Sequence, residues 1–109
     1  MNSKIIVITG ATDGIGLAAA KAIAGQGYRI GLVGRNPEKG KKAMEAIVSE
    51  TGNDKLDFFQ ADLSLVKEVV SLSNHIRNKY SHLNVLLNNA GGASKDKIIN
   101  QYHLYLPIG

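Results

Sequence analysis

Three closely spaced glycines form the part of this sequence best suited to chemistry. Gly10, Gly14 and Gly16 lie between a short apolar run and an alanine-rich segment with helical spacing. This order predicts a strand, a tight loop and a helix whose free N–H groups and positive dipole end suit an anion such as a diphosphate. Gly10 would let the chain leave the strand, Gly14 would let a phosphate approach the backbone, and Gly16 would let the helix pack closely.

The glycine pattern alone has a second interpretation. Residues 14–19 fit G-x-G-x-x-[GA], but a glycine-rich turn without a ligand is a common structural feature. The strand before the loop and the helix after it favour the phosphate-binding interpretation. A P-loop is excluded, because no Lys-Ser or Lys-Thr pair follows a glycine at the required spacing.

A basic residue follows the second predicted strand, where a dinucleotide-binding fold would recognise a ribose. Arg35 lies 19 residues after Gly16, at the end of the second predicted strand, with no carboxylate beside it. An acid at about this distance accepts hydrogen bonds from the ribose of NAD, whereas an arginine pairs with the 2′-phosphate of NADP. The sequence therefore favours NADP over NAD, with the negative charge of Asp13 acting against this preference. The alternative is a solvated Arg35 that contacts nothing.

Composition narrows the remaining classes of function. The 109 residues suffice for one domain, and 13 basic against 9 acidic residues give a mild net charge of +4. Lys39, Lys41 and Lys42 form either an anion patch or, as we prefer, a solvated helix face. No aromatic residues interleave with them, so a nucleic-acid partner is not expected. No apolar stretch reaches the length of a membrane span, and we expect a soluble, cytoplasmic protein.

Metal and disulfide chemistry are not expected. The sequence contains no cysteine, which excludes disulfides and thiolate ligands and fits a reducing compartment. His75, His82 and His103 are not spaced as metal ligands. We therefore assign no metal site.

Strand and helix patterns alternate along the chain. Strands are predicted over residues 4–9, 28–34, 56–60 and 84–87, and the first helix over 14–26. A second helix begins at Pro37 after an Asn36 cap and closes at Thr51-Gly52, and Ser64 caps a third. Such alternation predicts an α/β fold of Rossmann type, with a parallel sheet in the order 3-2-1-4. The apolar faces of the three helices comprise Ile15, Ala19, Ala22 and Ile23; Ala43, Met44, Ile47 and Val48; and Leu65, Val69, Leu72, Ile76 and Tyr80.

Four motifs together resemble the N-terminal half of a short-chain dehydrogenase/reductase, particularly members related to retinol dehydrogenases. The motifs are Thr9-Gly10-Ala11-Thr12-Asp13-Gly14-Ile15-Gly16, Gly34-Arg35-Asn36 with Glu38-Lys39-Gly40, Asp62-Leu63-Ser64, and Asn88-Asn89-Ala90-Gly91. The resemblance covers residues 4–91. It implies a half-domain over 1–92 that binds a dinucleotide, followed by a divergent tail over 93–109.

The resemblance also implies a role for each motif. The glycine loop would surround the diphosphate and adjoining ribose, the Arg35 segment would meet the far ribose, and the third and fourth motifs would border the adenine and the nicotinamide ribose. Asp62 has the alternative role of helping to cap the third helix, and Asn88 or Asn89 that of tying neighbouring strands together. The candidate cofactor-binding residues are Gly10, Thr12, Asp13, Gly14, Ile15, Gly16, Arg35, Asn36, Asp62, Leu63, Asn89, Ala90 and Gly91.

The sequence departs from the family where proton transfer is concerned. Members of the family carry a Tyr-x-x-x-Lys pair with a Ser and an Asn, and none of the four tyrosines here has a lysine four residues later. We therefore assign no catalytic residue and expect these 109 residues alone to be inactive. The favoured interpretation is a fragment of an NADP-dependent oxidoreductase that interconverts an alcohol and a carbonyl compound.

Two further functions stay open at this point. One is a natural short form that binds a dinucleotide without catalysis and regulates by association, and the other is another nucleotide-fold enzyme such as a methyltransferase. An unpaired edge of the fourth strand would give marginal stability or self-association through that edge.

Overall fold

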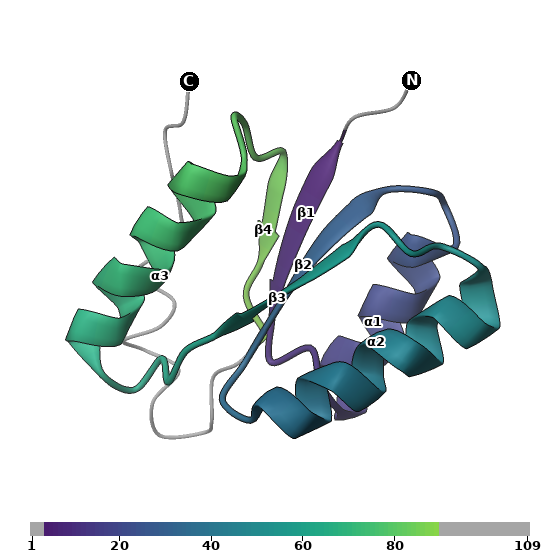
Figure 1. The fold of residues 1–109 in the computed structure, drawn as a ribbon, viewed down its shortest axis with the longest axis horizontal. Helices are drawn as coiled ribbons and strands as arrows, with labels where there is room; N and C mark the ends of the chain where they lie inside the picture. Colours follow the sequence, from purple (N-terminus) through teal and green to yellow (C-terminus); the bar gives the residue numbers. More distant parts are fainter. Residues whose placement is uncertain (1–3, 90–109) are drawn as a thin grey trace.

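The computed structural model describes residues 4–89, which form a four-stranded parallel sheet with helices on both faces (Figure 1). The strand order β3-β2-β1-β4 confirms the predicted topology. The strands are β1 (Ile5–Thr9), β2 (Arg29–Gly34), β3 (Leu56–Gln60) and β4 (Val85–Leu87), and the helices are α1 (Gly14–Ala24), α2 (Pro37–Thr51) and α3 (Val66–Lys79). Crossover helices between parallel strands bring all the carboxyl ends of the strands to one edge.

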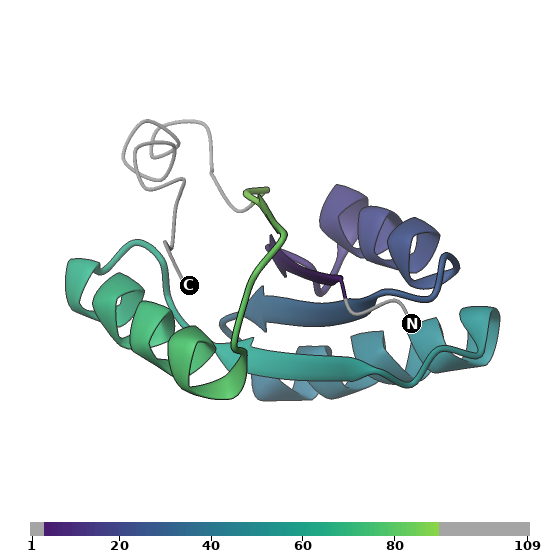
Figure 2. The ribbon, with the colours of Figure 1, turned by 90° about the horizontal axis from the view of Figure 1, so that it is seen from above.

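The sheet divides the apolar core into two layers. Helices α1 and α2 lie together on one face of the sheet and α3 lies on the other (Figure 2). Alternate side chains of β1 pack into the two layers, because successive side chains of a strand point to opposite faces of the sheet. Ile6 and Ile8 belong to the α1/α2 layer, whereas Ile5 and Val7 belong to the α3 layer. Both faces of β1 are thus buried, as its continuous apolar run predicts.

Helix α2 begins and ends where its residues predict. The side-chain oxygen of Asn36 accepts hydrogen bonds from the backbone N–H groups of Glu38 and Lys39, at 2.8 and 3.2 Å. Gly52 ends the helix in the left-handed conformation, with φ +76°. The predicted apolar face is correct for Ala43 and Ile47, which are buried, whereas Val48 is 39% exposed. Within this helix Gly40 is buried instead, against the Phe58 ring.

The predicted apolar face of α1 is correct for Ile23, which packs against the core, but wrong for Ile15 and Ala22. Its buried residues are Gly16, Ala20 and Ala24, whereas Ile15 is 79% exposed and Ala22 also faces solvent. In this helix the smallest residues, rather than the largest, face the sheet. A line of glycine and alanine lets the helix axis approach the strands closely, and Leu17 and Ile23 fill the space beside that line.

The predicted Ser64 cap of α3 is also wrong. The helix begins at Val66, with Leu65 at the cap position and no side-chain cap. Both the backbone N–H and the hydroxyl of Ser64 donate to the carboxylate of Asp62, at 3.0 and 2.7 Å. This local turn occupies Ser64 and delays the start of the helix. The predicted apolar face is correct for Leu72, Ile76 and Tyr80, which are buried, but Leu65 is 47% exposed.

Strand β4 forms one edge of the sheet. Within residues 4–89 it pairs with β1 alone, and Val85 and Leu87 are exposed. Asn84 extends this pairing, because its backbone N–H donates to the carbonyl of Ile5 and its side-chain oxygen accepts from the Ile5 N–H. Self-association through this edge stays a prediction. None of the helices in the described part of the chain is long and apolar enough to cross a membrane.

A polar cluster anchors α3 to the amino end of the sheet, opposite the glycine loop. The hydroxyl of Tyr80 donates to the Asp57 carboxylate at 2.5 Å, and Arg29 and Lys79 form ion pairs with it at 3.1 and 3.4 Å. Burial raises the pKa of Asp57, but the hydrogen bonds from Tyr80 and Arg29 and the charge of Lys79 outweigh it, so that its pKa lies below the ordinary value. The ionised carboxylate therefore stabilises the fold.

We expect Asp57→Asn to destabilise the protein by about 1 kcal/mol at pH 7, because the amide keeps the shape but loses the charge. A lowered pKa gives stability that is present above the unfolded-state pKa of about 4 and lost as the pH falls through the folded-state pKa. The difference between the two proteins in urea unfolding should therefore shrink as the pH falls below about 4 and vanish below the folded-state pKa of Asp57. Asp54→Asn is the matched control, since Asp54 is exposed. Equal stability of D57N and wild type at pH 7 would contradict the assignment.

Candidate functional site

The loop between β1 and α1 has the conformation that its glycines predict. Gly10 and Gly14 have φ values of +62° and +58°, which side-chain-bearing residues rarely adopt. A β-carbon built at Gly14 would meet no atom within 4 Å, so the space beside this backbone is open to a ligand. Thr12 lies at the middle of the loop and packs its methyl group over Gly34, at the end of β2. The loop thus spans the carboxyl ends of β1 and β2.

At Gly16, helix α1 packs closely against the glycine loop and the Asn89 side chain. A β-carbon at this position would overlap the carbonyl oxygen of Gly10 and would lie 2.7 Å from the side-chain nitrogen of Asn89. Three segments of the chain meet here: the loop, the first turn of α1 and the residues after β4. The predicted reason for this glycine, close helix packing, is confirmed, with the loop and Asn89 as the neighbours.

The N-terminus of α1 has no side-chain cap. Its cap residue, Asp13, makes no side-chain hydrogen bond to the helix, and its first turn contains no acidic residue. The first N–H groups of a helix have no partner within the helix. Helix α2 differs, because Asn36 caps it and Glu38 stands in its first turn. An incoming diphosphate would complete α1 as Asn36 completes α2, so the residues present fit this group.

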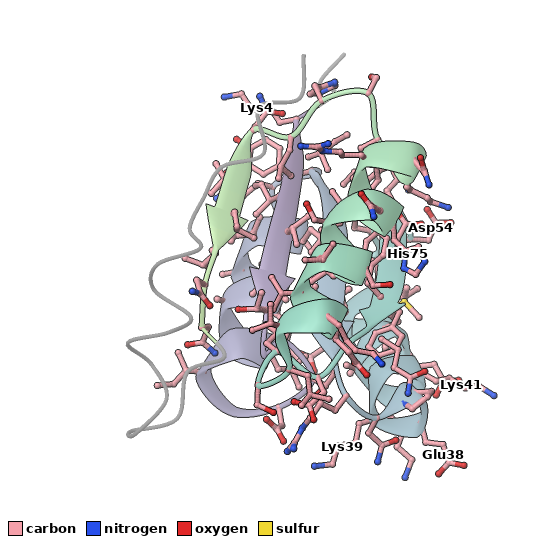
Figure 3. The ribbon with its side chains drawn as sticks, turned by 90° about the vertical axis from the view of Figure 1, so that its left-hand side faces the viewer. Lys4, Glu38, Lys39, Lys41, Asp54 and His75 are labelled. Carbon is pink, nitrogen blue, oxygen red and sulfur yellow. The ribbon has the colours of Figure 1, made fainter. Side chains whose placement is uncertain are left out.

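Asp13 instead forms an ion pair with Lys39 of α2, at 3.3 Å between Oδ2 and Nζ. Figure 3 shows Lys39 and Glu38 at the end of the molecule opposite Lys4, the residue that precedes β1. The pair therefore bridges the glycine loop and the start of α2. The sequence predicts a solvated helix face or an anion patch for Lys39 and misses this ion pair. No pattern in the sequence indicates the pair, because its two residues lie 26 positions apart.

Asn88 and Asn89 tie the ends of β1 and β4 together. The hydroxyl of Thr9 donates to the side-chain oxygen of Asn88 at 2.9 Å and accepts from the backbone N–H of Asn89 at 2.8 Å. The Asn89 side chain also donates to the carbonyl of Gly10, at 3.4 Å. This is the strand-tying role that the sequence left as an alternative. Ala90 and Gly91, the other two predicted residues of this motif, lie outside the described residues.

Arg35 and Asn36 follow β2 at the same edge of the sheet. Both are exposed, and the Arg35 carbonyl accepts a hydrogen bond from the Gln60 side chain at 3.3 Å. The Asn36 side-chain oxygen serves the cap of α2, which leaves the NH2 group for a ligand. No acidic residue lies between Gly34 and Asn36, so Arg35 gives the end of this strand its charge.

Asp62 and Leu63 occupy the turn after β3. The carboxylate of Asp62 accepts hydrogen bonds from Ser64, and the backbone N–H of Asp62 donates to the Glu68 side chain at 2.6 Å. Leu63 is partly buried against the α3 layer. The side chain of Asp62 thus shapes the turn before α3 rather than capping the helix directly. The predicted contacts of both residues with adenine stay predictions.

The described tyrosines offer no proton donor at this edge. Tyr80 lies at the opposite end of the sheet, where burial and the neighbouring Asp57 carboxylate raise the pKa of its hydroxyl above the ordinary value. A phenol that donates a proton at neutral pH requires a lowered pKa. Tyr80 is therefore a structural residue, and Tyr102 and Tyr105 lie outside the described residues.

Known proteins match this chain along most of its length. A 3beta-hydroxysteroid dehydrogenase of Mediterraneibacter gnavus is 44% identical over 96 residues, which cover 86% of this chain and 34% of that protein. Human retinol dehydrogenase 11 is 39% identical over 88 residues, covering 81% of this chain and 28% of that protein. The chain thus spans about a third of the length of these relatives.

Solved structures agree with the sequence matches. An oxidoreductase from Escherichia coli has a TM-score of 0.75 at 37% identity, covering 84% of this chain and 38% of that one. L-Sorbose reductase from Gluconobacter frateurii, solved with NADPH and L-sorbose, has a TM-score of 0.75 at 29% identity, covering 84% of this chain and 35% of that one. The profile of the short chain dehydrogenase family matches residues 4–103. This chain therefore belongs to the short-chain dehydrogenase family and has its Rossmann-type fold.

Proposed function

We propose that this chain forms the NADP(H)-binding part of an oxidoreductase that interconverts an alcohol and a carbonyl compound. The observation that carries the proposal is the uncapped N-terminus of α1 beside the open space at Gly14. Bound NADP(H) would supply or accept the hydride. The residues described here would bind and orient the cofactor, and the chemistry would need a proton donor that the described tyrosines do not offer.

Each side of the site would hold one part of the dinucleotide. The N–H groups at the start of α1 would bind the diphosphate, because they are the donors without an intrahelical partner. Arg35 and the Asn36 amide would meet the 2′-phosphate, Asp62 and Leu63 the adenine, and Asn89 with Ala90 and Gly91 the nicotinamide ribose. The remaining loop residues, Gly10, Thr12, Asp13, Gly14, Ile15 and Gly16, would line the diphosphate and adjoining ribose.

The preference for NADP over NAD rests on the end of β2. Arg35 is exposed there, and an arginine can pair with a phosphate through two parallel hydrogen bonds. Positions 34–36 contain no aspartate or glutamate that could accept a hydrogen bond from a ribose 2′-hydroxyl. Two neighbouring structures, L-sorbose reductase and actinorhodin polyketide ketoreductase, were solved with NADPH, which supports the same choice.

The names of the relatives support the class of substrate. They include a 3beta-hydroxysteroid dehydrogenase, a polyprenol dehydrogenase and a retinol dehydrogenase. These names specify apolar alcohols. We therefore propose a hydrophobic alcohol or ketone as the substrate of the whole enzyme.

Gly14→Ala tests the diphosphate site. We expect this change to weaken NADPH binding by about tenfold or more, because the added methyl group enters the open space beside the donor N–H groups. Gly52→Ala is the matched control. Gly52 also has a positive φ, +76°, and a β-carbon built there would also meet no atom within 4 Å. It lies at the C-terminal end of α2, away from the glycine loop. Both variants should lose about 1 kcal/mol of stability through backbone strain.

NADPH titration followed by cofactor fluorescence, together with urea unfolding, measures the two effects separately. Loss of binding in G14A but not in G52A supports the proposal. Equal affinity of G14A and wild type for NADPH would refute the diphosphate site.

A further inference from the structure

Asp13 has the position and backbone of a helix cap but does not act as one. Aspartate is among the favoured N-cap residues, and its carboxylate ordinarily accepts hydrogen bonds from the second and third N–H groups of the helix. At Asp13 the backbone is extended, as at other N-caps, with φ −160° and ψ 175°, yet no such hydrogen bond forms. The carboxylate points instead to Nζ of Lys39, 3.3 Å away on α2.

A capping Asp13 would compete with a diphosphate for the same donors. In α1, which begins at Gly14, the second and third N–H groups belong to Ile15 and Gly16. These are also donors that a diphosphate at the helix N-terminus needs. The negative charge of an unpaired Asp13 would in addition repel the phosphates. An Asp13 without its Lys39 partner would thus inhibit binding at the proposed site.

We propose that Lys39 holds the Asp13 carboxylate away from α1 and so keeps the dinucleotide site open. The inference rests on the proposed function, and it makes Lys39 a positioning residue that acts through Asp13. The backbone of Lys39 is held in the first turn of α2, because the Asn36 side chain accepts a hydrogen bond from the Lys39 N–H at 3.2 Å.

The ion pair is exposed, so the device is weak and reversible. The side chains of Lys39 and Asp13 are 59% and 71% exposed. Pairs of this kind shift an equilibrium by no more than about fivefold. The expected effect of losing the pair is therefore small, and the test depends on comparison among matched variants.

Lys39→Met should raise the Kd for NADPH and the Kd for NADH by the same factor, about three- to fivefold. The two cofactors respond alike because they share the diphosphate. Lys39→Arg should retain the wild-type affinity. Lys41→Met is the control, since it removes one exposed positive charge from the same helix; in Figure 3 the side chains of Lys39 and Lys41 leave α2 in different directions. A loss confined to NADPH would overturn the proposal by making Lys39 a direct contact of the 2′-phosphate.

Two double variants separate capping from simple charge. Asp13→Ala in the Lys39→Met protein removes both the charge and the ability to cap, and should recover more of the affinity lost in Lys39→Met than a variant that can still cap. Asp13→Asn in the same background removes the charge but keeps a good capping residue, and should restore only part of the affinity. Equal restoration by the two variants would overturn the proposal.

Amide chemical shifts of the dinucleotide-free protein give an independent readout. Lys39→Met should move the Ile15 and Gly16 resonances, as expected for a new cap, whereas Lys41→Met should not. This result would stand even if wild type bound neither cofactor, an outcome that would refute the proposed function rather than the position of Asp13. Unchanged resonances in K39M would overturn the inference.

Discussion

Replacing Gly16 by alanine is expected to destabilise the protein by about 2–3 kcal/mol and to abolish measurable dinucleotide binding. The new methyl group would overlap the Gly10 carbonyl oxygen and approach the Asn89 side-chain nitrogen to 2.7 Å. One of these neighbours is backbone in a loop fixed by a positive φ, so α1 itself must move. Its N–H groups would then leave the position in which, by the proposal, they would meet the diphosphate.

Gly25→Ala is the matched control for this change. Gly25 follows the last turn of the same helix with φ −62°, and a β-carbon there would find its nearest neighbour at 3.5 Å, an ordinary contact. This variant should be as stable as wild type or slightly more so, because alanine lowers the entropy of the unfolded chain. Urea unfolding and NADPH titration of the two variants check the prediction, which equal midpoints for G16A and wild type would contradict.

Arg35→Ala is expected to weaken NADPH binding by about 10- to 100-fold while changing NADH binding by less than about threefold. The difference arises because only NADPH carries the 2′-phosphate that Arg35 would pair with. Competition by 2′,5′-ADP against 5′-AMP isolates the same group without the nicotinamide half. The wild-type protein should prefer 2′,5′-ADP, and the variant should lose that preference.

Arg77→Ala serves as the control for a general loss of positive charge. Arg77 is exposed on α3, which covers the opposite face of the sheet from α2 (Figure 2). It should leave both affinities unchanged. If R35A weakened NADPH and NADH by equal factors, Arg35 would act on the shared diphosphate, and the proposed basis for choosing NADP would be wrong.

Local rules were enough to predict most of the fold. Asn36 and Pro37 at the start of α2, and Gly52 at its end, are signals that act within a few residues, and the structure confirms all three. The strand order followed from the alternation of elements, because parallel strands require right-handed crossovers. These features depend little on which side chains meet across the core.

The errors arose where contacts between distant segments decide the outcome. In the alanine-rich α1, hydrophobicity hardly distinguishes the faces, and the buried face is set by how closely Gly16 can approach Gly10. At the start of α3, the sequence favours Ser64 as the cap, but in the structure its N–H and hydroxyl groups donate to the Asp62 carboxylate instead. The Asp13–Lys39 pair joins residues 26 positions apart, and no pattern in the sequence announces it.

The burial of both faces of β1 has a consequence for the register of this strand in the sheet. Ile5 and Val7 face one layer and Ile6 and Ile8 the other, so shifting the strand by one residue would exchange two sets of nearly equal size. Burial alone would scarcely penalise that shift. The shift would instead break the hydrogen bonds between the Thr9 hydroxyl and Asn88 and Asn89, which follow β4. The hydrogen bonds of Thr9, at the end of β1, therefore fix the register of the central strand.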